Sequence, residues 1–199
     1  MELIQQVPEI SAYLAADDAI EHEHPLIRDT AARLRSEATD AYSYAEAAYC
    51  YVRDTVVHSS DSGDMRVTWR ASDVLATRNG ICHAKAHALV ALLRAEGIPA
   101  GLCYQALAND DGTPGPVHGL IALRLPGRDR WDRQDPRGNR PGVDAQFSLD
   151  RERLAWPVRP ELGEVDCPTL HAAPHPAVLR ALRTADDRAE LWRTLPTAL

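Results

Sequence analysis

Residues 71–105, ASDVLATRNGICHAKAHALVALLRAEGIPAGLCYQ, predict the helix around which the rest of the chain is arranged. An Asn-Gly pair gives a turn or cap signal, and apolar residues then recur at helical spacing as far as Leu93. Gly97 suits the position just after a helix end, and the proline two residues later prevents continuation. We therefore expect a helix over residues 81–96.

Cys82 lies in the first turn of this helix, on the apolar stripe that we expect to be buried. The polar residues on a flank turned away from that stripe are His83, His87 and Arg94. The partial positive charge and free N–H groups of a helix N-terminus stabilise a thiolate, the reactive form of cysteine. They can also bind the oxyanion of an attacked carbonyl. The position therefore suits a nucleophile, although a small buried core residue is the alternative.

The composition is that of a soluble globular protein, with 45% hydrophobic and 26% charged residues in a chain of 199. A net charge of −7 without a basic cluster argues against nucleic acid as a partner. No apolar run reaches the length of a membrane span, and the N-terminus lacks a signal-peptide pattern, so we expect no membrane partner and a cytoplasmic location. The four cysteines have no CxxC spacing and are expected to be reduced thiols: Cys50, Cys82, Cys103 and Cys167.

The hydrophobic period changes from helical to strand-like after Pro99. We expect helices over 26–34 and 40–57, a polar loop over 58–64 and a capped helical turn over 72–75. An antiparallel meander is expected over 100–107, 117–125 and 131–135, then an irregular segment over 137–174 and one final helix over 177–195. The prediction is a single α+β domain spanning residues 1–199.

Three residues follow in an order that suits covalent catalysis. Cys82 begins a helix, His118 begins a strand, and Asp135 ends the next strand. Because adjacent antiparallel strands lie about 4.8 Å apart, His118 and Asp135 are within reach of each other. A thiolate nucleophile, an imidazole that accepts and returns a proton, and a carboxylate that orients the ring make a triad. A solvated strand-end histidine and a turn aspartate before Pro136 are the alternatives.

The segment GICHAKAHALVALLRAEGIPAG resembles the nucleophile segment of the transglutaminase-like superfamily. The superfamily continues with a histidine on a strand and then W-x-x-x-D-P, which correspond here to PVHGLIAL and WDRQDPRGN. The GVDAQF run at 142–147 also resembles the bacterial stand-alone branch. The resemblance covers about residues 45–150. It implies a papain-like core fold, with the nucleophile helix packed on an antiparallel sheet, and a Cys82–His118–Asp135 triad.

The chain departs from this pattern after the histidine, where the superfamily often has an aromatic residue and this chain has Gly119. An empty position there either opens the site to substrate or has little functional meaning. Asp132 and Asp144 are rival carboxylates, but the spacing before the proline favours Asp135. For the second oxyanion donor, Trp69 and Gln105 are the candidates, with the indole N–H of Trp69 preferred.

The histidines four apart in the helix, His83 and His87, have the spacing of a metal pair, but no further ligands follow at zinc spacing. We expect surface or packing roles for them. Lys85 is the only lysine of the chain and is expected to be solvated or salt-bridged; raising the positive potential near the thiolate is its alternative role.

The leading hypothesis is cysteine-dependent acyl transfer at an amide, ester or thioester carbonyl, without metal or organic cofactor. The partners are a peptide or small-molecule acyl donor, with water as acceptor in a peptidase or amidase and an amine in a transglutaminase or amide-forming transferase. A non-catalytic binding or scaffold module with the same fold is the alternative. A metal-dependent hydrolase using Cys82, His87 and His118 is a third, weaker hypothesis.

Overall fold

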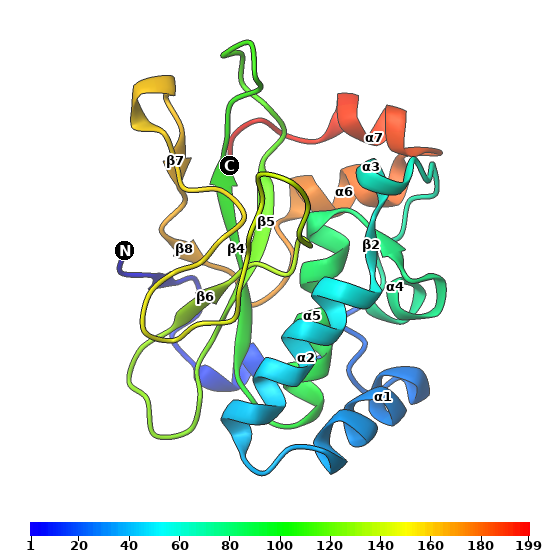
Figure 1. Ribbon diagram of the computed structural model, residues 1–199, viewed down its shortest axis with the longest axis vertical. Coiled ribbons are helices and arrows are strands. Elements are labelled where there is room, and N and C mark those ends of the chain that lie inside the picture. The colour runs from blue at the N-terminus through cyan, green and yellow to red at the C-terminus, as the bar shows by residue number, and fades with distance from the viewer.

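Helix α5 (Cys82–Ala95) runs through the middle of the molecule in a computed structural model that describes residues 1–199 (Figure 1). Thirteen of its fourteen residues are buried, and only Ala95 is partly exposed. It packs between a group of helices and a sheet, so it has no solvated face. The expectation that His83, His87 and Arg94 lie on an outward flank is therefore wrong, because all three are buried.

Two buried charged residues of α5, Arg94 and Lys85, bond to backbone carbonyl groups of other segments. Arg94 donates to the carbonyl oxygens of Ala15, Ala100 and Ala172. Lys85 is fully buried and donates to carbonyl oxygens at the C-terminal end of α2, so the expectation of a solvated or salt-bridged lysine is wrong. These bonds satisfy groups that are costly to bury alone.

The helices that cover one side of α5 are α1 (Pro25–Ser36), α2 (Ala41–Thr55) and α4 (Ala71–Thr77). They confirm the helices expected over 26–34, 40–57 and 72–75. Asp40 starts α2 through a capping box, in which its carboxylate accepts the Ser43 N–H at 2.8 Å.

The sheet on the other side of α5 has the order β6-β5-β4-β7. The antiparallel meander expected after the helix is confirmed as β4 (Ala100–Ala106), β5 (His118–Leu123) and β6 (Asp132–Gln134). Strand β7 (Val165–Asp166) adds to the free edge of β4 from the segment expected to be irregular. Helices and strands make up 38% and 16% of the chain, so the α+β class is confirmed.

Two short pairings fasten distant parts of the chain together. Strand β1 (Ile4–Gln5) pairs in parallel with β8 (Thr169–Leu170), and β2 (Val57–His58) pairs in parallel with β3 (Asn79–Gly80). Single-turn elements are η1 (Ile10–Leu14), α3 (Ser59–Ser62) and η2 (Pro160–Leu162). The expected polar loop over 58–64 is thus wrong over 58–62, where His58 is buried in a strand and the next four residues form α3.

The C-terminal region contains two helices where one was expected over 177–195. Helix α6 (Pro176–Thr184) ends at Ala185, which is extended, and α7 (Arg188–Thr194) begins after Asp187, whose carboxylate caps it. The start of α7 lies beside the segment that follows α3, because the Arg188 N–H donates to the Met65 carbonyl at 2.9 Å. The break turns α7 across the end of the molecule at which β5 begins.

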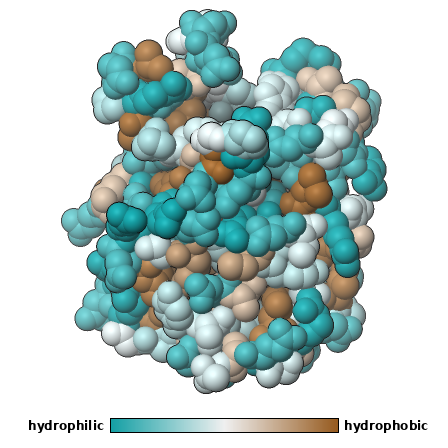
Figure 2. All heavy atoms as spheres, in the orientation of Figure 1, coloured by the Kyte–Doolittle hydropathy of each residue, from teal (hydrophilic) through white to brown (hydrophobic).

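No helix of the structure is both long and apolar enough to cross a lipid bilayer. The face of the molecule in Figure 2 is mostly hydrophilic, with apolar side chains in small scattered groups.

Candidate active site

Cys82 is the first residue of α5, and its side chain opens onto a cleft of about 460 Å³. Because α5 starts here, the Cys82 N–H is one of the donors that the helix itself leaves free. The cleft lies at the start of β5, and Glu164 before β7 and Trp192 of α7 also line it. The lining residues that bear on its chemistry are His58, Cys82, His118, Arg140, Trp156 and Trp192.

His118 and Asp135 form a buried pair in which His118 Nε2 lies 2.8 Å from Asp135 Oδ2. His118 is the first residue of β5, and Asp135 directly follows β6, which pairs with β5 in antiparallel register. The predicted proximity of these two residues is therefore present. Because Nε2 is bonded to Asp135, Nδ1 is the ring nitrogen that remains for the Cys82 thiol.

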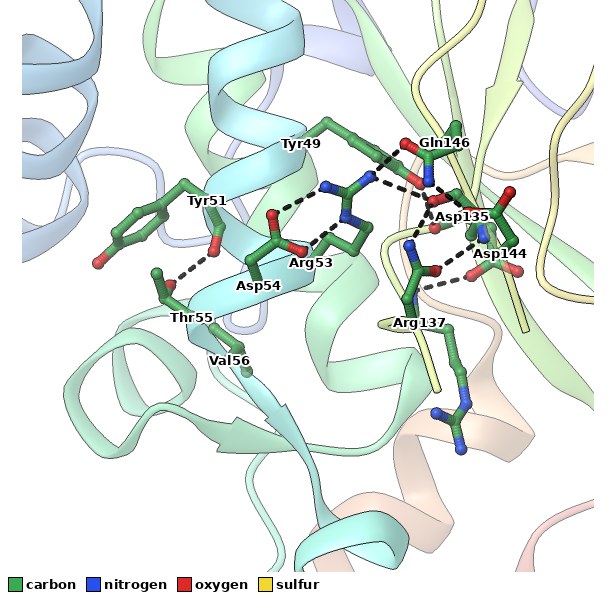
Figure 3. Close-up of polar contacts among 12 residues, drawn as sticks. Tyr49, Tyr51, Arg53, Asp54, Thr55, Val56, Asp135, Arg137, Asp144 and Gln146 are labelled. Atoms are coloured by element: carbon green, nitrogen blue, oxygen red, sulfur yellow. Dashed lines mark hydrogen bonds and ion pairs between the residues drawn. The ribbon is translucent and has the colours of Figure 1, made fainter. Parts of the chain in front are cut away.

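Backbone groups hold the Asp135 carboxylate in place. Oδ1 accepts the Arg137 N–H and Oδ2 accepts the Ala155 N–H, each at 3.0 Å. Helix α2 anchors the same segment, because Tyr49 donates to the Asp135 carbonyl at 2.9 Å and Arg53 donates to Gln146 Oε1 at 2.8 Å (Figure 3). The carboxylate therefore has a fixed orientation toward the imidazole.

The charges of the site favour a cationic His118. Burial alone lowers the pKa of this imidazole, but the Asp135 carboxylate and the Cys82 sulfur outweigh burial and raise the pKa to about 10. The pKa of Asp135 is lowered. Burial alone would raise it, but the positive charge of His118 and the hydrogen bonds from His118 and two backbone N–H groups outweigh burial. At neutral pH the pair is an imidazolium and a carboxylate.

His58 is a site residue that sequence reasoning missed. Its Nε2 accepts the Cys82 N–H at 3.2 Å, and its Nδ1 lies 2.9 Å from Ser60 Oγ. Burial, followed by the charge of Arg137, lowers the pKa of His58 to about 3, so the ring is neutral at pH 7. The pairing of β2 with β3 places His58 opposite Gly80, two residues before Cys82.

Trp156 covers the imidazole on the cleft side. Its ring meets that of His118 edge to face, with 4.9 Å between centroids and an angle of 89°. The Arg137 guanidinium lies 5.3 Å from the centroid of the same indole and is paired with Asp61. An apolar ring beside the His118–Asp135 pair limits the access of water to it.

The two candidates for a second oxyanion donor do not line the cleft. The Trp69 ring lies against the guanidinium groups of Arg70 and Arg183, each 4.5 Å from its centroid. Gln105 is opposite His118 in the register of β4 and β5, but its amide donates to Asp166 at 2.9 Å. The structure does not bring either side chain to the Cys82 N–H.

The rival carboxylates have other partners. Asp132 pairs with Arg128 and Arg130, and Asp144 is exposed and pairs with Arg153. Neither is bonded to His118, so Asp135 is the only carboxylate that orients the imidazole.

Gly119 does not open the site to substrate, so the first of the two alternatives for its missing side chain is wrong. A Cβ at this position would lie 2.2 Å from Nδ1 of His83 and 2.9 Å from its Cε1. The His83 ring, which projects from α5, therefore fills the space beside Gly119. Burial lowers the pKa of His83 to about 3, so it is a neutral packing residue.

The third hypothesis, a metal site built from Cys82, His87 and His118, has no support in the side-chain arrangement. No group of three or more His, Cys, Asp or Glu side chains is arranged to hold a metal ion. The His87 ring instead bonds to the carbonyl oxygen of Trp69, with Nδ1 at 2.7 Å.

Comparison with known proteins agrees with this architecture. A model of the transglutaminase-like superfamily matches residues 28–136, which is more than half of the chain. A provisionally assigned cysteine protease from Cytophaga hutchinsonii is similar in structure, with 21% identity and a TM-score of 0.54 over 65% of this chain and 42% of that one. The periplasmic domain of TgpA from Pseudomonas aeruginosa is 24% identical, with a TM-score of 0.44 over 62% of this chain and 45% of the other. The chain thus spans less than half the length of these structures, and comparison with curated proteins finds no match.

Proposed function

The chain belongs to the transglutaminase-like superfamily, and we propose that it transfers acyl groups through a covalent intermediate on Cys82. The observation that carries the proposal is the buried His118–Asp135 pair, 2.8 Å apart, in the same cleft as a cysteine at a helix N-terminus. Such a pair supplies the proton transfers that a cysteine nucleophile needs.

In the first half of the reaction, the Cys82 thiolate attacks the carbonyl carbon of the donor and a C–S bond forms. The carbonyl π electrons move to oxygen and give a tetrahedral oxyanion. When this intermediate collapses, the bond to the leaving amine, alcohol or thiol breaks, and His118 gives its Nδ1 proton to that group. A thioester on Cys82 remains, and His118 is neutral.

In the second half, neutral His118 accepts a proton from water or an amine as that acceptor attacks the thioester carbon. The second tetrahedral intermediate expels the Cys82 thiolate, and the imidazolium forms again. Water gives an acid and an amine gives a new amide, so one site supports hydrolysis and transfer. We propose a peptide or small-molecule acyl donor for both.

We assign the oxyanion to the Cys82 N–H and to the Nε2–H form of His58. In the free protein each ring nitrogen faces a backbone donor: the Cys82 nitrogen lies 3.2 Å from Nε2, and the Ser60 nitrogen lies 3.3 Å from Nδ1. A neutral imidazole accepts at only one of them. When Nδ1 accepts from the Ser60 N–H and from the Ser60 hydroxyl, whose Oγ is 2.9 Å away, the proton of the ring is on Nε2. An oxyanion placed between the two groups would then accept from Nε2–H and from the Cys82 N–H.

The test is intact-protein mass spectrometry after incubation with a panel of nitrophenyl esters, thioesters and glutamine-containing peptides. We expect an added acyl mass that maps to Cys82 and disappears when hydroxylamine or an amine is supplied. Cys82→Ala, which leaves only a small void, should lose the adduct and keep the fold. Cys50→Ala is the matched control, because Cys50 is a partly exposed thiol away from the cleft. Turnover of a verified substrate by Cys82→Ala would end the proposal.

A further inference from the structure

One end of the cleft carries two arginines that share a single carboxylate. Both terminal nitrogens of Arg137 bond to Asp61, with Nη2 and Oδ1 2.8 Å apart. Arg140 Nη1 lies 3.5 Å from the same Asp61 Oδ1 and donates no side-chain hydrogen bond within the protein. Both arginines line the cleft, so this end has an excess of one positive charge.

The two arginines differ in what they are free to do. Arg137 is 2% exposed, and its Nε–H has no acceptor in the protein, so its charge is fixed in place and only partly matched. The Arg140 side chain is 51% exposed and held by one long contact. Arg140 is therefore the guanidinium available to a ligand, with Arg137 and Asp61 as its rigid support.

This arginine pair lies close to the reacting atoms. Asp61 lies in α3, three residues after His58, which caps this helix and accepts the Cys82 N–H. Arg137 and His118 also contact the same indole, Trp156. Arg140 and Cys82 line the same cleft, so we expect a group a few bonds from the reacting carbonyl to reach Arg140.

The other charges of the cleft do not offer an equivalent site. Arg159 lines the cleft and is 46% exposed, but it donates to Glu164 from Nε and Nη2, at 3.1 and 2.6 Å. The remaining ionisable group of that region is Asp110, which is negative. An anion is favoured only at the Arg140 end.

We propose that Arg140 binds a carboxylate of the acyl donor, a few bonds from the carbonyl that Cys82 attacks. The inference deepens the proposed function and rests on it, because it names the chemical class of the donor. A planar guanidinium with unused N–H donors binds a carboxylate through two parallel hydrogen bonds. The site therefore selects acidic donors, such as a peptide with an acidic side chain or a free C-terminus next to the reacting bond.

The test uses two alkylating probes that differ only in charge, N-iodoacetyl-glycine and N-iodoacetyl-glycinamide. Each places its reactive carbon on Cys82 and its terminal group further into the cleft. Second-order rate constants are measured by peptide mass spectrometry for the wild type, Arg140→Gln and Arg159→Gln, and divided by those for glutathione. We expect the wild type to favour the acid over the amide, and Arg140→Gln to reduce that preference by roughly tenfold to a hundredfold.

The Arg159→Gln variant is the matched control, since it removes the same charge from the same cleft and should change the preference by no more than about threefold. An equal loss in both variants would overturn the site in favour of a diffuse field. No preference in the wild type would also overturn it. These two results overturn only the Arg140 site, and the proposed function stands if Cys82 still reacts selectively. If neither probe labels Cys82 ahead of Cys50, that result counts against the proposed function itself.

Whether the carboxylate is a side chain or a C-terminus is read from a second pair of probes. Iodoacetyl-glutamic acid α-amide presents only the side-chain carboxylate, and iodoacetyl-glutamine presents only the terminal one. The probe whose rate depends on Arg140 identifies the source, and independence of both from Arg140 contradicts the proposal.

Discussion

His118 Nε2 and Asp135 Oδ2 lie 2.8 Å apart, and both side chains are closed to solvent. The pair spans two strands of the sheet, and its carboxylate is held by two backbone N–H groups. Its position directs Nδ1 of the imidazole to the remaining partner, Cys82, whose sulfur helps to keep the ring cationic.

Replacing Asp135 with Asn should lower turnover by roughly two to four orders of magnitude, because the amide no longer fixes the ring or stabilises its charge. It should also lower the pKa of His118, which is observable by NMR titration of the imidazole. Asp144→Asn is the control, since Asp144 is an exposed carboxylate paired with Arg153. A large loss in Asp144→Asn with little change in Asp135→Asn would refute the assignment of the third residue.

His58→Ala should reduce kcat by roughly a hundredfold to a thousandfold, because one oxyanion donor is lost. His58→Gln should recover part of that loss, since its amide N–H is able to donate. The rate at which iodoacetamide alkylates Cys82 should change little in both variants, because alkylation forms no oxyanion. Parallel losses of alkylation and turnover would mean that His58 acts on the thiolate instead.

Gly119→Ala should destabilise the fold by about 1–3 kcal/mol, because the new Cβ meets the buried His83 ring. When His83→Ala is combined with Gly119→Ala, most of the destabilisation caused by the new Cβ should disappear. Chemical denaturation of the two single variants and the double variant measures this coupling. Additive effects of the two substitutions would show that the His83 ring does not occupy this space.

The buried Lys85 should make the free energy of unfolding depend on pH. Burial, followed by the charge of Arg137, lowers its pKa to about 7 from the ordinary 10.5, so the unfolded chain binds more protons between these values. The contribution of Lys85 to the free energy of unfolding therefore rises with pH across this window. His118 acts in the opposite direction, because its raised pKa gives stability that is lost as the pH rises toward 10.

The measurement is the difference in unfolding free energy between the wild type and Lys85→Met, in urea at pH 7 and pH 9.5. Because both proteins contain His118, its contribution cancels when they are compared at the same pH. The unfolding free energy of the wild type minus that of Lys85→Met should increase from pH 7 to pH 9.5. A difference that stays constant would contradict a buried, readily deprotonated Lys85.

Local patterns were sufficient to predict α5, the three-stranded meander and the order of Cys82, His118 and Asp135. Helix periodicity, turn residues and strand alternation can each be recognised in a short segment of sequence. His58 left no such signal. A strand of two residues has no periodicity, and its contact with Cys82 crosses 24 positions of the chain.

The errors in α5 and at the C-terminus have a related cause. Arg94 is polar in sequence but buried in the fold, because the carbonyl groups of Ala15 and Ala172, both far along the chain, and of nearby Ala100 converge on it. The end of α6 at Ala185 had only a weak local signal, yet it brings Trp192 and Leu195 of the C-terminal region to the cleft. Tertiary context overrode local preference at both places.

The pH profile of Cys82 alkylation tests the central claim most directly, since a cationic His118 beside the sulfur favours the thiolate. Peptide mass spectrometry should show iodoacetamide labelling Cys82 well below pH 7, ahead of Cys50, Cys103 and Cys167. In His118→Ala that reactivity should move to higher pH. An ordinary thiol profile for Cys82 that is unchanged in His118→Ala would contradict a thiolate–imidazolium pair in the free protein.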